Sequence, residues 1–222
     1  MSLDILFIHP NASKKIYQGL SNEHSAIEPP IWAGMLANHC RNKNNKVKIL
    51  DCEVEKLDYI TSAQKIKDIK PRIACFVVYG QQPSASSQNM EGAVATAEEL
   101  KKLDSEIKVL FVGGHVSALP TETLTAEESI DFVALNEGVY AISSLLKVEN
   151  LNEEKYLKKV KGIGFRNNDN QITINESEII VPKKLLDIDL PGVAWDLLPP
   201  LKEYRTAGWH SWSNNSEKQP FA

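Results

Sequence analysis

The stretch VLFVGGHVSALP, residues 109–120, indicates both a type of fold and the place of a binding site. Four apolar residues lead directly to Gly113 and Gly114, as in a strand that is buried on both faces of a sheet. Two adjacent glycines remove two side chains from the end of that strand, so another group can approach the backbone closely. We therefore expect a central strand that ends at a ligand-binding crevice.

Similar apolar runs recur along the first 150 residues, and amphipathic segments separate them. The expected strands are 3–8, 46–51, 72–78, 107–112 and 131–135. The expected helices are 31–41 after Pro29-Pro30, 61–69 capped by Thr61, 87–103 and 139–147. Because these runs are too apolar to be half exposed, they predict a Rossmann-like, doubly wound α/β fold. Its five-stranded parallel sheet should have the order 2-1-3-4-5, with right-handed crossovers.

The alternation of apolar runs and amphipathic segments ends at about residue 150. Residues 162–175 predict a β-hairpin that turns around Asn168-Asp169-Asn170, and 178–182 could add a short strand. The remaining residues are rich in proline and hold Trp195, Trp209 and Trp212, an aromatic cluster typical of a missing partner surface. The alternative is that they pack along this same domain. We expect a main domain over 1–150, a β appendage over 151–185 and a linker over 186–222.

Composition excludes several classes of protein. The chain has 222 residues, 42% of them hydrophobic, and a net charge of −4 with both signs interspersed, so a nucleic-acid-binding face is not expected. No apolar run approaches the roughly 20 residues that a membrane span needs. Cys40, Cys52 and Cys75 are far apart, which argues against a disulfide or zinc framework and favours buried thiols in a reducing, cytoplasmic compartment.

Ligands of doubly wound sheets bind beyond the carboxyl ends of the strands, at the point where the strand order reverses. The loops expected there are 9–28, 79–88, 113–120 and 136–138. The glycine pair would let a flat or bulky ligand lie on the backbone, and the serines beside a helix N-terminus favour phosphate. A tight turn and a helix cap are the alternative explanations of these two features. The candidate binding residues are Tyr79, Gln81, Ser84, Ser86, Ser87, Gly113, Gly114, His115, Asn136, Glu137 and Gly138.

Several familiar motifs are missing from the sequence. No GxGxxG follows the first strand, and neither GxxxxGK[ST] nor GxSxG occurs. The first and third expected strands also lack acidic residues at their tips, which argues against a receiver domain.

Four segments in order carry a resemblance to a known family: EPPIWAGMLANHCRNKNNKVKILDCE, VGGHVSALPTETL, DFVALNEGVYAISSLL and LPGVAWDLLPPLKEYR. Together they resemble the N-terminal cobalamin-binding domain of radical S-adenosylmethionine enzymes, a group that includes the anaerobic magnesium-protoporphyrin ester cyclases. The resemblance implies cobalamin in the crevice, with its nucleotide tail lined by Ser84, Ser86, Gly113 and Gly114. It also implies methyl transfer or a cobalt-assisted cyclisation or rearrangement, in company with a C-terminal radical SAM barrel.

The sequence departs from the full enzymes of that family in one decisive way. Their barrel holds an iron–sulfur cluster and S-adenosylmethionine through CxxxCxxC, which does not occur here. We therefore expect a fragment that lacks the barrel and has no catalytic or metal-ligating residue of its own. A stand-alone cobalamin carrier or sensor, or a nucleotide- or sugar-nucleotide-binding enzyme domain, are the alternatives.

The loop after the first strand lacks the DxHxxG motif that many cobalamin carriers have. No histidine is therefore expected below the cobalt: His9 should be held by the sheet, and His24 lacks a visible orienting partner. His39 lies on a helix face beside Met35 and should be structural.

Overall fold

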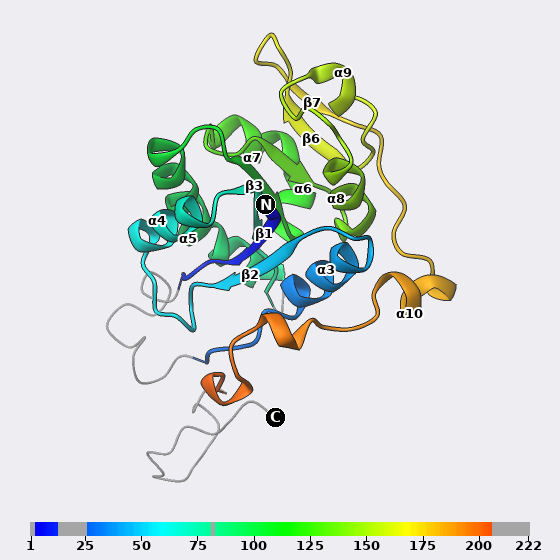
Figure 1. Ribbon diagram of the computed structural model, residues 1–222. Helices are drawn as coiled ribbons and strands as arrows, with labels where there is room; N and C mark the ends of the chain where they lie inside the picture. Colours follow the sequence, from blue (N-terminus) through cyan, green and yellow to red (C-terminus); the bar gives the residue numbers. More distant parts are fainter. Residues whose placement is uncertain (1–2, 13–25, 81–82, 206–222) are drawn as a thin grey trace.

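The computed structural model describes residues 3–12, 26–80 and 83–205, with side chains in the last range described from residue 85 onward. Its core is a sheet with helices on both faces (Figure 1). The sequence-based prediction of an α/β, Rossmann-like fold is confirmed. No helix in these ranges is both long enough and apolar enough to cross a membrane.

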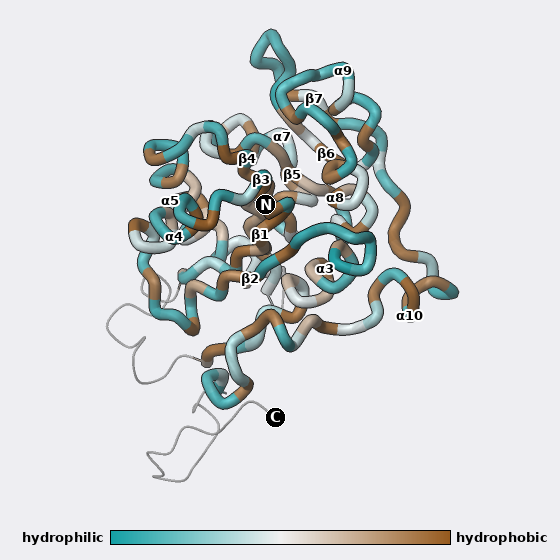
Figure 2. Tube along the Cα trace, viewed as in Figure 1, coloured by the Kyte–Doolittle hydropathy of each residue, from teal (hydrophilic) through white to brown (hydrophobic). Residues whose placement is uncertain are grey.

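Five parallel strands form the main part of the sheet, in the predicted order β2-β1-β3-β4-β5. Their bounds are β1 Leu3–His9, β2 Val47–Asp51, β3 Pro71–Val77, β4 Lys108–Val112 and β5 Phe132–Ala134. Alternate residues of each strand point to opposite faces. Ile5 and Phe7 therefore enter one core, while Leu6 and Ile8 enter the other. The brown interior of Figure 2 follows these strands.

The helices divide between the two faces. On one side lie α3 (Ile31–Asn42) and α8 (Val139–Leu146). On the other lie α4 (Tyr59–Ile69), α5 (Pro83–Leu103), α6 (Gly114–Ala118) and α7 (Pro120–Ala126). Both faces of the sheet are thus covered, which is why its strands are apolar throughout rather than alternating.

Two helix starts differ from the prediction. Asp58, not Thr61, is the N-cap of α4: its carboxylate accepts from the Thr61 main-chain N–H at 2.8 Å, and the Thr61 hydroxyl oxygen accepts from the Asp58 N–H at 3.0 Å. Thr61 is the third residue of the helix (N3). It therefore belongs to this reciprocal capping box, although Asp58 is the N-cap. Helix α5 begins at Pro83, four residues before the predicted start, because proline is well suited to a first helical turn.

The predicted hairpin is present and extends the main sheet. Strands β6 (Ile163–Arg166) and β7 (Ile172–Ile174) are antiparallel, and β6 pairs with β5, which gives a seven-stranded sheet. The short helix α9 (Glu154–Leu157) precedes it. The strand considered at 178–182 does not form, since those residues have no regular structure.

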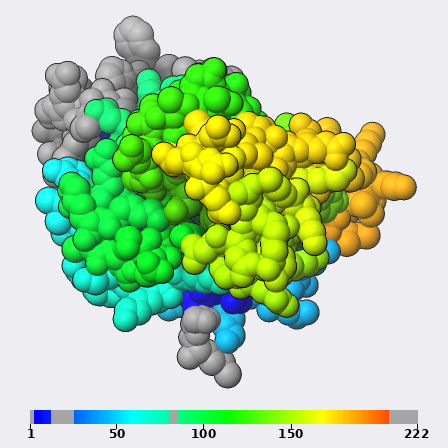
Figure 3. Space-filling view, turned by 90° about the horizontal axis from the view of Figure 1, so that it is seen from above, coloured from blue at the N-terminus to red at the C-terminus, as the bar shows by residue number. Residues whose placement is uncertain are grey.

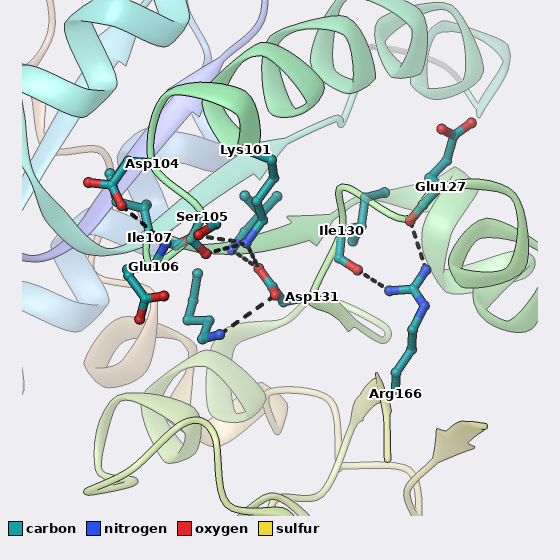
Figure 4. A network of polar contacts seen from close by, with 11 residues as sticks. Lys101, Asp104, Ser105, Glu106, Ile107, Glu127, Ile130, Asp131 and Arg166 are labelled. Carbon is teal, nitrogen blue, oxygen red and sulfur yellow. Dashed lines mark hydrogen bonds and ion pairs between the residues drawn. The ribbon is translucent and has the colours of Figure 1, made fainter. Parts of the chain in front are cut away.

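A polar network at the amino edge of the sheet holds this hairpin in place (Figure 4). Arg166 of β6 donates to the main-chain carbonyls of Ile130 at 2.5 Å and Glu127 at 2.8 Å, and to that of Leu124. Lys101 of α5 donates to the Asp131 carboxylate at 2.6 Å. Arg166 therefore caps the C-terminal end of α7 while it joins β6 to the parallel sheet.

The C-terminal segment folds back over the domain. It contains the short helices η2 (Lys183–Leu185), α10 (Leu186–Asp189), η3 (Trp195–Leu197) and η4 (Leu201–Glu203). Gly34 of α3 provides the close contact, because a Cβ there would lie 2.3 Å from the Val193 side chain. Seen from above, the segment from β6 onward overlies one side of the molecule (Figure 3).

This segment ends in a buried anchor. Tyr204 is 1% exposed, and its hydroxyl donates to the Asp51 carboxylate at 2.9 Å. Arg205 and Ile27 form an isolated antiparallel bridge. The part of the expected linker that the structure describes therefore packs along the domain, although Trp195 remains 45% exposed. Trp209 and Trp212 lie outside the described residues.

Candidate functional site

The loops after β3, β4 and β5 meet at the carboxyl edge of the sheet. The Tyr79 hydroxyl, after β3, donates to the main-chain carbonyl of Asn136, after β5, at 2.6 Å. The Asn136 main-chain N–H in turn donates to the Ser117 hydroxyl of α6 at 2.8 Å. These bonds span the position of β4, so they fix three loops relative to one another. The predicted crevice residues from different strands are therefore neighbours in space.

Ser86 locks α5 to the end of β4. It is 2% exposed, and its hydroxyl donates to the Val78 carbonyl at 2.5 Å and accepts from the His115 main-chain N–H at 2.9 Å. A buried hydroxyl that is satisfied on both sides stabilises the loop geometry. Ser86 thus holds the start of α6 next to the residue that follows β3.

Ser87 and His115, which directly follow Ser86 and Gly114, provide polar groups at this edge. The Ser87 hydroxyl is exposed, and it shares a 2.9 Å hydrogen bond with Nδ1 of His115. With a neutral imidazole accepting at Nδ1, the Nε2 nitrogen carries the proton and is the donor. The pair offers a hydroxyl and an imidazole N–H to a ligand.

The glycines of this region serve different purposes. A Cβ on Gly113 would lie 2.8 Å from the backbone of Val78, so the neighbouring chain requires a glycine there. A Cβ on Gly114 would meet only Ser86, at 3.7 Å, an ordinary contact. Gly114 is exposed, so its backbone is open to a ligand. Gly138 has a φ of +74°, a left-handed conformation that favours glycine, and it begins α8.

An aromatic stack that the sequence analysis missed lies beside this crevice. The rings of Trp32, in the first turn of α3, and Tyr79 stack with centroids 4.7 Å apart and an interplanar angle of 22°. Burial, with a smaller contribution from Glu137, raises the pKa of Tyr79 to about 12, so its hydroxyl stays a neutral donor. The signal in the sequence was the tryptophan two residues after the Pro29-Pro30 pair.

The remaining predicted residues fall into two groups. The Glu137 carboxylate accepts from the main-chain N–H of Val181 at 2.9 Å and so holds the segment that follows the hairpin. Gln81 lies outside the described residues. Ser84 belongs to α5, but its side chain is also outside the described part of the chain.

A cluster of ionisable groups lies at the ends of β1 and β2. His9 Nε2 is 3.4 Å from the Glu53 carboxylate. Burial alone would lower the pKa of His9, but Glu53 and the charges of Asp51 and Glu28 outweigh it and raise the pKa. We expected the sheet to hold His9, but its ion-pair partner Glu53 lies in the turn that follows β2. His24 lies outside the described residues.

His39 also has the structural surroundings that the sequence indicated. It is 1% exposed, with Nδ1 donating to the Asp189 carbonyl at 2.6 Å and Nε2 2.8 Å from the Ser143 hydroxyl. Within residues 3–12, 26–80 and 83–205, no group of three or more His, Cys, Asp or Glu side chains is arranged to hold a metal ion.

Comparison with known proteins gives this geometry a context. A family model described as the B12 binding domain matches residues 20–146, more than half of the chain. An uncharacterized methyltransferase of Pyrococcus horikoshii, PH0819, is 27% identical over 180 residues, which cover 81% of this chain and 36% of that protein.

Two solved enzymes share the fold. The cobalamin-dependent S-adenosylmethionine radical enzyme OxsB, with aqua-cobalamin and S-adenosylmethionine bound, matches 88% of this chain and 24% of its own, with 16% identity and a TM-score of 0.63. The radical S-adenosylmethionine methyltransferase TsrM of Kitasatospora setae matches 79% of this chain and 30% of its own, with 13% identity and a TM-score of 0.57. This chain therefore spans about a third or less of the length of these proteins.

Proposed function

Because the chain belongs to the B12-binding domain family, we propose that it holds cobalamin at the carboxyl edge of β3, β4 and β5. We propose further that it does so as one part of a cobalamin-dependent radical SAM enzyme. The observation that carries the proposal is Gly114: its backbone is exposed, it directly precedes His115 of the Ser87–His115 pair, and a Cβ there would meet only Ser86, at 3.7 Å. A large ligand could lie against that backbone without displacing protein atoms.

The chain's own groups suit the chemistry of this ligand. Cobalamin carries amide side chains, a phosphodiester and an aromatic base. The His115 Nε2–H can donate to an amide or phosphate oxygen, the Ser87 hydroxyl oxygen can accept from an amide N–H, and the Trp32–Tyr79 stack offers an aromatic surface. The Ser86 and Tyr79 hydrogen bonds keep these groups in place before any ligand arrives.

When bound, cobalamin would supply cobalt-centred chemistry such as methyl-group transfer. Within the proposed enzyme, this chain's residues bind and orient it, while a C-terminal radical SAM barrel provides the iron–sulfur cluster and S-adenosylmethionine. Support for methyl transfer comes from the name of the Pyrococcus horikoshii relative. Cobalt-assisted cyclisation or rearrangement belongs to the same proposal.

Titration of the purified chain with hydroxocobalamin, followed by absorbance spectroscopy and equilibrium dialysis, tests the proposal. Gly114→Val places a branched side chain where the ligand would lie, and overpacking of this kind costs about 1–3 kcal/mol. We therefore expect a roughly 5- to 150-fold loss of affinity.

Ala118→Val is the matched control, because it adds a branched side chain at the exposed other end of α6. Its affinity should equal that of the wild type, and thermal unfolding should show that both variants are folded. A wild-type chain that binds no hydroxocobalamin would contradict cobalamin binding. Full affinity in Gly114→Val would place the ligand elsewhere.

A further inference from the structure

Residues 199–205 form a short segment at the carboxyl edge of β2, which we call the latch. Most of its residues are exposed, but Tyr204 is 1% exposed. The main chain of Arg205 pairs with that of Ile27 through two hydrogen bonds of 2.9 Å. A buried side chain and a short bridge thus hold the latch on the domain. Segments with so few buried residues open locally at a low free energy.

The latch covers a cluster of acidic groups around one histidine. The Tyr204 hydroxyl donates to the Asp51 carboxylate at 2.9 Å, and Asp51 is the partner of His9 in the register of β2 and β1. His9 Nε2 lies 3.4 Å from the Glu53 carboxylate, and both side chains are mostly buried. Glu28, the neighbour of Ile27, adds a third negative charge that acts on His9. Carboxylates in such a place need a positive charge or a proton to offset them.

His9 is the group of this cluster whose charge can change near neutral pH. Burial would lower the pKa of His9, but the hydrogen bond to Glu53 and the nearby acidic charges outweigh burial and raise it. Burial also raises the pKa of Asp51 and that of Glu28. The guanidinium of Arg205, which follows Tyr204, keeps its charge at all these pH values. The cluster therefore holds its protons more tightly than the same groups would in water.

We propose that the latch is pH-sensitive: it is docked while His9 carries a proton and detaches when His9 loses it. Without that proton, the charges of Asp51 and Glu53 repel each other beneath Tyr204, with no charge on His9 to offset them. Detachment of Tyr204 exposes Asp51 to water, where like charges repel less. Docking thus takes up a proton, and the latch is released as pH rises through the folded pKa of His9. No residue of the proposed cobalamin site takes part, so cobalamin binding and latch release can be tested separately.

Hydrogen–deuterium exchange of the full chain at pH 6 and pH 9, read by mass spectrometry, is the test. After correction for the intrinsic pH dependence of exchange, the protection of peptides over the latch should fall about 5-fold from pH 6 to pH 9. This is the effect of about one charge pair. Peptides over β4 are the internal reference and show whether the domain stays folded. Equal latch protection at the two pH values would overturn the proposal.

Two histidine variants assign the titrating group. His9→Gln keeps a polar side chain that is uncharged at both pH values, so its latch protection should be low and independent of pH. The matched control His115→Gln removes an imidazole from the loop after β4, and it should keep the 5-fold change of the wild type. A pH dependence that persists in His9→Gln would assign the change to another group and contradict the proposal.

Tyr204→Phe separates the hydrogen bond from the titration. It keeps the aromatic ring and removes the hydroxyl that donates to Asp51. Latch protection should fall about 10-fold at both pH values, the effect of one hydrogen bond to a charged group. The difference between pH 6 and pH 9 should remain, because His9 is unchanged. Wild-type protection in Tyr204→Phe would show that this bond does not hold the latch, and it would overturn the proposal.

Discussion

Gly113 and Gly114 are adjacent, yet only one of them is required by the fold. Gly113 directly follows the end of β4 and lies against the Val78 backbone. A Cβ on Gly113 would lie 2.8 Å from that backbone. Gly114 turns into α6, and its nearest neighbour would be Ser86 at 3.7 Å. The group that approaches the Gly113 backbone closely is therefore the Val78 main chain of the same domain. The Gly114 backbone remains exposed, so a ligand could approach it.

This contrast predicts different effects of the same substitution. Gly113→Ala should lower the free energy of unfolding by about 1–3 kcal/mol, because the added methyl group overpacks the junction with Val78. Gly114→Ala should change it by less than about 1 kcal/mol, since the methyl group would make only an ordinary contact with Ser86 at a helix start. Urea unfolding of both variants measures this difference. Equal loss of stability in the two variants would contradict the assignment.

At the scale of elements, α3 is the hub that joins the N-terminal sheet to the C-terminal segment. His39 bonds the main chain at the end of α10 and the Ser143 hydroxyl of α8. Asp189 of α10 also accepts from the Tyr140 hydroxyl of α8 at 2.7 Å and pairs with Lys43 at 3.1 Å. Three helices distant in the sequence are therefore held by one buried imidazole and its surroundings. Burial lowers the pKa of His39 more than the Asp189 carbonyl raises it.

This surrounding predicts a specific pH dependence of stability. With its folded pKa below the ordinary value of about 6.5, His39 binds fewer protons in the folded chain than in the unfolded chain, so its contribution falls on acidification. The wild-type free energy of unfolding minus that of His39→Gln should therefore decrease from pH 8 to pH 5. The folded pKa of His9 is raised, so His9 stabilises the folded chain at low pH and loses this effect as pH rises through the folded pKa. The wild-type free energy of unfolding minus that of His9→Gln should therefore decrease with rising pH. Urea titrations across this range measure both slopes, and slopes of the same sign would contradict this account.

At the scale of the whole molecule, the three cysteines lie on different elements, and all of them are buried. Cys40 lies on α3, Cys75 on β3 and Cys52 directly after β2, and all three are buried free thiols. Burial raises the pKa of Cys40 and of Cys52 to about 12, and that of Cys75 also rises. Thiolates, which cluster ligation requires, are thus disfavoured at each position.

We therefore expect this chain alone to assemble no iron–sulfur cluster and to cleave no S-adenosylmethionine. Anaerobic reconstitution with iron and sulfide, followed by desalting and iron counting, should leave less than stoichiometric iron on the protein. The triple Cys→Ala variant at positions 40, 52 and 75 is the control, and it should retain the same background amount. Stable iron that depends on these cysteines would contradict the expectation and place cluster chemistry within this chain.

Much of the architecture could be read from local patterns. Apolar runs such as 72–78 are too hydrophobic for any position except a sheet covered on both faces, and short right-handed connections then leave few strand orders. The turn Asn168-Asp169-Asn170 likewise predicted its hairpin, because hairpin turns depend on a few adjacent residues. The positions of Tyr79, Ser87, His115 and Asn136 at one edge followed from the topology alone.

Contacts between distant residues could not be predicted in this way. No local pattern shows that Arg166 caps α7 and so extends the sheet, or that Trp32 stacks on Tyr79. Side-chain periodicity reports burial and backbone conformation, whereas hydrogen-bond partners and cavity walls depend on which elements meet across the folded chain. Gly113 and Gly114 are identical in sequence terms, and only their neighbours in space give them different roles.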